Sequence, residues 1–338
     1  MNNGLEEELE KFKNITKTIF AHYARWNGYS YTDYLKFQEG FTEIVKAHVR
    51  KERRLENKLR PYLKKYSQDY IEDFRQWALS SEECLFNDVA KSDKIFVGDF
   101  HTVKQPKEML LQIAQAILNK GRPVTICLEM VLSRQQQLLE SYLAGRVSER
   151  EFLNKINYYK DWGFCWPYYR QIFEFASKHK EMVKLVGIDS NRNAFNCYLR
   201  DDHAAKIIYS EIKNSPERAV IVFAGDLHIA SKHLPYKTKK LIGQDAKSLI
   251  IYQNKSSIYW SLGREGKLKE EGLIKGVVKI GDKGYCVLNI HPAIKWFSYL
   301  VWEKQRKIKS KTAIENIYKK CAQIVEELCK CKKDKSLK

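Results

Sequence analysis

Two stretches decide how this sequence is interpreted: Lys94-Ile95-Phe96-Val97-Gly98-Asp99-Phe100-His101 and Val220-Ile221-Val222-Phe223-Ala224-Gly225-Asp226-Leu227-His228. In each, a short apolar run is followed by the pattern Gly-Asp-apolar-His. A continuous apolar run of this length predicts a strand buried on both faces of a sheet. Carboxylate and imidazole groups are uncommon beside such strands unless they bind or react. We therefore interpret the repeat as part of a functional site.

Strands and helices are predicted to alternate from residue 94 to about residue 234. Strands are expected at 94–98, 123–128, 182–188 and 220–224 in this stretch, and at 248–252 after it. Helices are expected between the first four of them, at 106–120, 168–179 and 199–213. Alternation of this kind is typical of right-handed βαβ units. The predicted fold class is therefore α/β, with a mostly parallel sheet sandwiched by helices.

The flanking segments have a different character. Residues 1–90 carry helical apolar stripes and are expected to be helical throughout, with helices at 5–23, 32–60 and 66–79. Later strands are expected at 257–262, 276–280 and 285–290, the last two as a hairpin, before a basic helical tail. We divide the chain into an N-terminal helical region (1–90), an α/β domain (91–255) and C-terminal strands with the tail (256–338).

Composition narrows the class of protein. The 338 residues are 44% hydrophobic, as in a globular protein, and no apolar stretch reaches the roughly 18–20 residues of a membrane helix. The N-terminus has no signal-peptide pattern or lipid-attachment cysteine, so we expect a cytoplasmic protein whose eight cysteines are free thiols. The net charge is +19, but the lysines are scattered without a nucleic-acid-binding motif, so nucleic acid is not an expected partner.

Polar side chains follow four of the predicted strands, where parallel α/β sheets bind ligands. They are Asp99 with His101, Glu129, Asp189, and Asp226 with His228. Residues two apart in an extended segment point the same way, so each Asp is expected to pair with its His. Two imidazoles and a carboxylate form a metal-ligand set. Without a metal, an imidazole oriented by a carboxylate is a general base.

The alternative for each of these residues is structural. A single Asp-x-His after a strand is more often a helix cap or a turn than a ligand. The second copy and Glu129 favour a site, whereas His203 on a helix and His233 in a loop are expected to be structural. The sequence contains no Walker loop, no Gly-x-Gly-x-x-Gly and no Gly-x-Ser-x-Gly, which argues against an NTPase, a dinucleotide enzyme and a common serine hydrolase.

An ordered series of motifs resembles the ChaN domain of the haem-binding-uptake and Tiki superfamily, over about residues 90–255. The series is Gly98-Asp99-Phe100-His101, Leu128-Glu129-Met130, Gln135-Gln136, Tyr142-Leu143-Ala144-Gly145, Trp162-Gly163, Tyr168-Tyr169, Arg200-Asp201 and Gly225-Asp226-Leu227-His228. The resemblance implies an α/β sheet with a pocket at His101, Glu129 and His228. It also implies that Arg200 is an anion clamp.

The resemblance leaves three functions open. The first is binding of haem, iron or another divalent metal (Fe, Mn or Zn), with His101, Glu129 and His228 as ligands. The second is hydrolysis, either metal-dependent as in Tiki-type relatives or with a histidine base as in erythromycin-esterase-type relatives. Asp99, Asp226 and Asp189 would then orient the catalytic groups. The third is an inactive pocket, with residues 1–90 and the basic tail binding partners. The expected ligand is haem or a small molecule, and a homodimer is compatible with the sequence.

Overall fold

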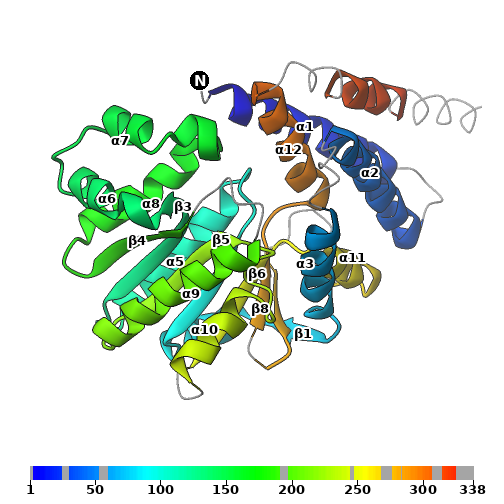
Figure 1. The fold of residues 1–338 in the computed structure, drawn as a ribbon. Helices are drawn as coiled ribbons and strands as arrows, with labels where there is room; N and C mark the ends of the chain where they lie inside the picture. Colours follow the sequence, from blue (N-terminus) through cyan, green and yellow to red (C-terminus); the bar gives the residue numbers. More distant parts are fainter. Residues whose placement is uncertain are drawn as a thin grey trace, which may run out of the picture. The chain divides into compact units, whose positions relative to one another are not determined.

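The computed structural model of the protein (Figure 1) describes residues 3–24, 30–52, 60–190, 197–243, 247–267, 276–282, 284–306 and 314–324. The chain divides into two units, each assembled from segments that are far apart in the sequence. Unit 1 comprises Met1–Leu55, Asn254–Ile274 and Ile290–Lys338, and unit 2 comprises Glu56–Gln253 and Lys275–Asn289. The motifs quoted above all lie in unit 2.

An eight-stranded sheet forms the centre of unit 2, in the order β1-β7-β8-β6-β2-β5-β3-β4. Its strands are β1 (Trp77–Ser80), β2 (Lys94–Asp99), β3 (Val124–Leu132), β4 (Val183–Asp189), β5 (Ala219–Gly225), β6 (Ser248–Gln253), β7 (Gly276–Ile280) and β8 (Gly284–Leu288). The pairings from β8 through β4 are all parallel. Among the strands that the structure describes, β1 with β7 and β7 with β8 are antiparallel, the latter being the predicted hairpin. The predicted α/β fold class is confirmed.

Helices cover both faces of this sheet, as continuous apolar strands require. On one face, α4 (Glu82–Ala90), α5 (Gln105–Leu118) and α8 (Trp166–Lys178) share a core with alternate strand residues such as Ile95, Val97 and Ile221. The opposite face is covered by α9 (Cys197–Asn214) and α10 (Leu234–Ile242), drawn in yellow-green in Figure 1. The short helices α6 (Gln136–Leu143) and α7 (Glu149–Lys155) lie beside α8.

Two sequence predictions of secondary structure are wrong. The helix expected at 66–79 is α3 (Arg60–Glu72), and the chain then forms the edge strand β1, so residues 1–90 are not helical throughout. The strand expected at 257–262 lies within helix α11 (Ser256–Arg264). A six-residue apolar run fits either a strand or a buried helix, and here the helix buries Ile258, Tyr259 and Trp260. The helix expected at 32–60 corresponds to α2 (Tyr31–Glu52), and 53–59 lie outside the described residues.

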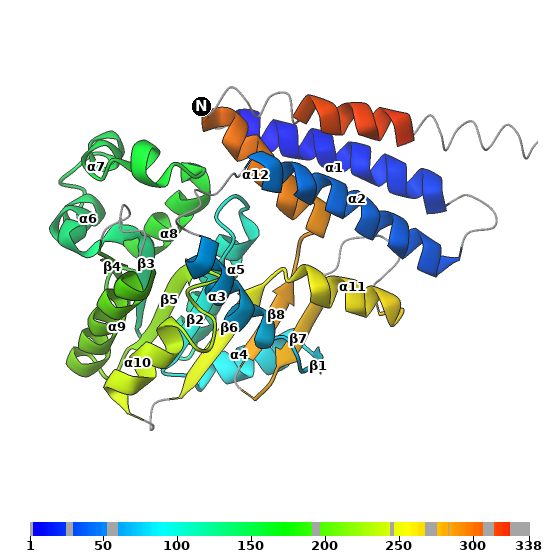
Figure 2. The same ribbon diagram turned by 45° about the vertical axis from the view of Figure 1, so that its right-hand side comes forward.

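Unit 1 is helical in its described part. The helices α1 (Asn3–Ala24), α2 and α12 (Pro292–Arg306) lie side by side (Figure 2), and residues 314–324 form one more helical segment. Phe12 of α1 is fully buried and stacks on Phe297 of α12, with ring centroids 3.7 Å apart. In the described parts of both units, every helix is too short or too polar to cross a membrane.

Candidate functional site

The two Gly-Asp-apolar-His motifs lie at the same edge of the sheet, because β2 and β5 are parallel neighbours. They are nevertheless one residue out of register. Asp99 pairs with Gly225, and Gly98 pairs with Ala224. Asp99 is therefore the last residue of β2, whereas Asp226 falls in the turn after β5. Identical motifs thus present their aspartates on different backbone conformations.

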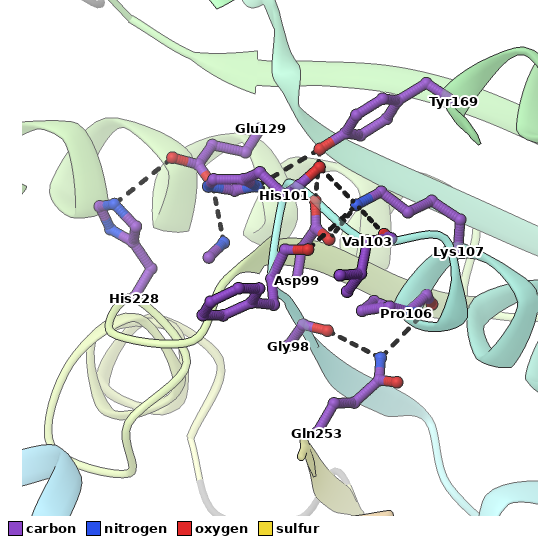
Figure 3. Close-up of polar contacts among 12 residues, drawn as sticks. Gly98, Asp99, His101, Val103, Pro106, Lys107, Glu129, Tyr169, His228 and Gln253 are labelled. Carbon is purple, nitrogen blue, oxygen red and sulfur yellow. Dashed lines mark hydrogen bonds and ion pairs between the residues drawn. The ribbon is translucent and has the colours of Figure 1, made fainter. Parts of the chain in front are cut away.

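The first motif forms a hydrogen-bonded cluster around Asp99 (Figure 3). His101 Nδ1 lies 2.8 Å from Asp99 Oδ2, the Tyr169 hydroxyl donates to the same oxygen at 2.6 Å, and Lys107 Nζ donates to Oδ1 at 2.5 Å. Asp99, Lys107 and Tyr169 are buried. Burial alone would raise the pKa of Asp99, but the Lys107 ammonium and His101 hold it below its ordinary value. The predicted pairing of Asp99 with His101 is present, and Asp99 is an ionised acceptor.

Aromatic rings flank the His101 imidazole. Trp162 closes a single π-helical turn (Tyr158–Trp162), and Gly163 at φ 68° then reverses the chain toward Phe164. The ring centroids of Trp162 and Phe164 lie 4.7 and 4.8 Å from that of His101. Such turns are rare and are frequently found at functional sites. Together with the Asp99 hydrogen bond, these rings fix the direction in which His101 Nε2 points.

Glu129, which lies within β3, is the centre of the site. Its Oε2 accepts the Gly225 backbone N–H at 2.7 Å, and its Oε1 accepts Arg200 Nη2 at 2.8 Å. His228 Nε2 lies 3.4 Å from the same Oε1. Burial alone would raise its pKa, but His228, Arg200 and His101 lower the pKa of Glu129 to about 2. The carboxylate is therefore ionised throughout the physiological range.

A glycine at position 225 allows His101 and Glu129 to approach each other. A Cβ there would lie 3.2 Å from His101 Nε2 and 3.5 Å from Glu129 Oε2. The first distance is tighter than ordinary van der Waals contact. The glycine of the first motif has a comparable role, because a Cβ on Gly98 would overlap the Asp226 carboxylate. The glycines of both motifs thus provide space for polar side chains of the site region.

The second histidine has a different aspartate from the one predicted. His228 Nδ1 lies 2.6 Å from Asp201 Oδ1, and the Tyr66 hydroxyl donates to Asp201 Oδ2 at 2.7 Å. Asp226 accepts instead from the Tyr70 hydroxyl, at 3.2 Å. The predicted pairing of Asp226 with His228 is wrong because the segment is not extended: the His228 N–H donates to the Gly225 carbonyl at 2.8 Å in a turn. Burial alone would lower the pKa of His228, but Asp201 and Glu129 raise it above its ordinary value.

Arg200 links the end of β4 to Glu129 within β3. Its guanidinium donates from Nε and Nη2 to the two oxygens of Asp189, at 2.9 and 2.8 Å, and from Nη2 to Glu129. Asp189 also accepts the Ser190 backbone N–H at 2.8 Å. In this arrangement, Asp189 and Glu129 both engage the guanidinium that was predicted to clamp an anion.

The structure thus brings together His101, Glu129, His228, Asp99, Asp189 and Arg200, and it places Asp226 against Tyr70. Sequence reasoning missed four residues, namely Lys107, Tyr169, Asp201 and Tyr66. Asp201 was visible in the Arg200-Asp201 pair, but only the fold shows that it faces His228. His203 Nε2 lies 2.8 Å from the Ser133 hydroxyl, and His233 Nδ1 lies 2.7 Å from the Leu227 carbonyl, so both histidines have partners outside the His101–Glu129–His228 cluster.

The residues predicted to bind a metal or haem do not form such a site in this geometry. Among the residues that the structure describes, no three His, Cys, Asp or Glu side chains are placed to hold a metal ion. His101, Glu129 and His228 do not fit a divalent cation, because the Arg200 guanidinium already binds Glu129 at 2.8 Å. They do not fit haem either, because a porphyrin needs an open face at its axial ligand. The side chains of His101 and His228 are only 18% and 13% exposed.

A model of a known protein family matches part of the chain. Residues 85–198 match the model of a family described as haem-binding uptake, Tiki superfamily, ChaN, which confirms the resemblance over that stretch. The match includes His101 and Glu129 and ends before Arg200, Asp201 and His228. None of the curated proteins is similar enough in sequence to count as a match.

Three solved structures resemble parts of this chain at low sequence identity. ChaN of Campylobacter jejuni with cofacially bound haem is 15% identical, with 62% of this chain and 92% of that chain covered and a TM-score of 0.41. The type III effector HopBA1 is 12% identical, with 54% and 87% covered and a TM-score of 0.39. The C-terminal region of Pasteurella multocida toxin, whose description names a thiol-protease-like triad, is 12% identical, with 54% and 25% covered and a TM-score of 0.35. These likenesses are too distant to support an argument about function.

Proposed function

We propose that the protein is a metal-independent hydrolase of carboxylic esters, with His101 as general base and His228 as general acid. One observation carries the proposal. Two imidazoles each place Nδ1 on a buried aspartate, at 2.8 and 2.6 Å, and flank the same ionised carboxylate, Glu129. An imidazole held by a carboxylate at Nδ1 is the arrangement that orients a catalytic histidine.

His101 suits the role of base. Because Asp99 is ionised, the hydrogen bond requires a proton on His101 Nδ1, which leaves the lone pair on Nε2. Nε2 points to the side of Gly225 where Glu129 also lies. A water molecule there gives its proton to Nε2, and its oxygen attacks the ester carbonyl carbon. Lys107 supports this step indirectly, because its charge keeps Asp99 ionised.

His228 suits the role of acid. It lies between the carboxylates of Asp201 and Glu129, which favour the protonated ring. Its Nε2 proton passes to the alkoxide oxygen when the carbonyl–oxygen bond breaks. The proton taken up by His101 is then lost to solvent, and His228 is reprotonated. The products are one carboxylic acid and one alcohol, so the water is fully accounted for. Arg200 holds Glu129 in place from the other side.

The test is hydrolysis of p-nitrophenyl acetate and butyrate by the intact chain, with and without EDTA. We expect saturable hydrolysis that EDTA leaves unchanged, and a loss of roughly 10²–10⁴-fold in kcat for His101→Ala and for His228→Ala. His179→Ala is the matched control, because His179 lies at the C-terminal end of α8 and contacts Phe175. Loss of activity in EDTA, or equal rates in all three variants, contradicts the proposal.

Haem binding is a second candidate, favoured by the description of the family that matches residues 85–198. It requires ligands other than the His101 and His228 cluster, and the chain contains 20 tyrosines that are chemically suitable for ferric haem. Titration of the protein with haemin tests this candidate. We expect a saturable Soret shift that persists in the His101→Ala, His228→Ala double variant. Absence of the shift at micromolar protein rejects haem binding.

A further inference from the structure

Helix α3 precedes residues 85–198, the stretch matched by the family, yet its side chains reach the second histidine. We infer that Tyr66 of α3 is a positioning residue that holds Asp201 in the orientation His228 needs, so that α3 completes the site. The inference rests on the proposed function for its catalytic consequence. The hydrogen-bond relay itself can be tested without any activity.

The relay runs through buried atoms. The Tyr66 hydroxyl donates to Asp201 Oδ2 at 2.7 Å, and Asp201 Oδ1 lies 2.6 Å from His228 Nδ1. Tyr66 and Asp201 are each 1% exposed. The two hydrogen bonds use opposite oxygens of one carboxylate, so the hydroxyl prevents that carboxylate from rotating away from the ring. A buried hydroxyl with such a partner is retained in one geometry, because losing the bond leaves a polar group unpaired.

The first histidine has a relay of the same composition. Tyr169 donates to Asp99 and Asp99 accepts from His101, at 2.6 and 2.8 Å. In the first relay the aspartate and the histidine are two residues apart at the end of β2, whereas in the second they come from α9 and from the turn after β5. Tyr169 lies on α8 and Tyr66 on α3. The site therefore consists of two Tyr-Asp-His relays, and the second one exists only when α3 is in place.

Helix α3 is attached to the loop that carries His228, through residues that follow that histidine. The next turn of α3 places Asp69 Oδ2 3.0 Å from His233 Nε2, and the Tyr66 ring lies 3.6 Å from the His233 ring. Asp73 accepts the Ser231 N–H at 2.8 Å, directly after the helix ends. These contacts hold α3, and with it the Tyr66 hydroxyl, against the loop that carries His228.

The groups that face His228 are Asp201 and Arg200 from α9, Glu129 from β3 and the Tyr66 ring from α3. Asp201 is the partner at Nδ1 and Glu129 the partner at Nε2. Because the Tyr66 hydroxyl donates to Asp201, removing it changes the partner at Nδ1, whereas Glu129 stays in place at Nε2. The partners at the two ring nitrogens of His228 can therefore be tested separately.

The test compares Tyr66→Phe with Tyr70→Phe in the intact chain. Tyr70 lies one turn further along α3 and donates to Asp226, which does not bind His228, so it is the matched control. The readouts are the ¹⁵N chemical shifts of the histidine rings and the kcat and KM for p-nitrophenyl acetate. For Tyr66→Phe we expect altered His228 Nδ1 shifts, unchanged His101 shifts and a roughly 10-fold lower kcat, the equivalent of one hydrogen bond. Tyr70→Phe is expected to match the wild type.

Asp201→Asn is the second variant, and it keeps the shape of the side chain if Tyr66→Phe folds poorly. It is expected to change the same His228 signals and to leave those of His101 in place. Unchanged His228 shifts in both variants, or equal changes in Tyr66→Phe and Tyr70→Phe, overturn the inference. If the wild type does not hydrolyse esters, the proposed function fails while the ring shifts still decide whether the relay exists.

Discussion

Replacing Lys107 with methionine removes a buried positive charge and keeps most of the side-chain volume. Lys107 is 0% exposed, and its Nζ donates to Asp99 Oδ1 at 2.5 Å and to the carbonyls of Val103, His101 and Phe100 at 3.0, 3.1 and 3.4 Å. Burial lowers the pKa of this ammonium, and Asp99 opposes that effect. In Lys107→Met, the Asp99 carboxylate stays buried with only His101 and Tyr169 as partners.

The expected cost follows from that uncompensated charge. Removing one partner of a buried ion pair destabilises a protein by about 3–5 kcal/mol. For a unit of roughly 200 residues, each kcal/mol lowers Tm by about 2–4 °C, so the expected decrease is about 6–20 °C. Replacing both charges removes the isolated carboxylate, so Lys107→Met combined with Asp99→Asn is expected to cost less than the sum of the single changes.

Differential scanning calorimetry of the intact chain measures this effect. The matched control is Lys104→Met, one helical turn earlier, where the lysine is 52% exposed and lies 3.3 Å from Glu108. A surface pair of this kind contributes about 0–1 kcal/mol, so the control is expected to melt close to the wild type. The reasoning is refuted if Lys107→Met has the same Tm as Lys104→Met. It is also refuted if the double variant loses as much stability as the two single variants together.

Three further predictions concern Asp99 and Gly225 in the site and His291 in unit 1. In Asp99→Asn, the carboxamide cannot hold the His101 tautomer, so kcat for ester hydrolysis is expected to fall by roughly 10³–10⁴ at unchanged KM, and equal kcat rejects the assignment. Gly225→Ala places a methyl group 3.2 Å from His101 Nε2 and is expected to lower kcat several-fold, whereas Gly40→Ala, with open space around it, leaves kcat unchanged. Burial lowers the pKa of His291 in unit 1 to about 3. This pKa lies below the unfolded value of about 6.5. The contribution of the neutral His291 ring to the free energy of unfolding is therefore present above pH 6.5 and is lost as pH falls. At pH 5 the loss is about 2 kcal/mol. Calorimetry at pH 7 and pH 5 measures this loss. If His291→Phe loses as much stability between these two pH values as the wild type does, the reasoning is contradicted.

The central strands were predictable because their short apolar runs alternate with helical patterns along the chain. A run such as Ile95-Phe96-Val97 in that series fits a parallel strand that is covered by helices on both faces. Residues 257–262 were not predictable in this way, because a short apolar run buries itself equally well as a helix. The choice between strand and helix for these residues depends on packing within unit 1. The rings of Trp260 and Tyr259 lie 5.7 and 5.2 Å from the ring of His291, which comes later in the sequence.

Prediction from the sequence is limited in the same way for single residues of the site. The repeated motif correctly predicts which edge of the sheet carries His101 and His228, because parallel neighbours end together. It does not predict which aspartate each histidine uses, since that depends on where the strand stops. β2 continues through Asp99, so the period of two holds nearly to His101, whereas β5 stops at Gly225 and the turn removes Asp226 from His228. The aspartate that His228 requires then comes from α9, whose position is set by packing rather than by the motif.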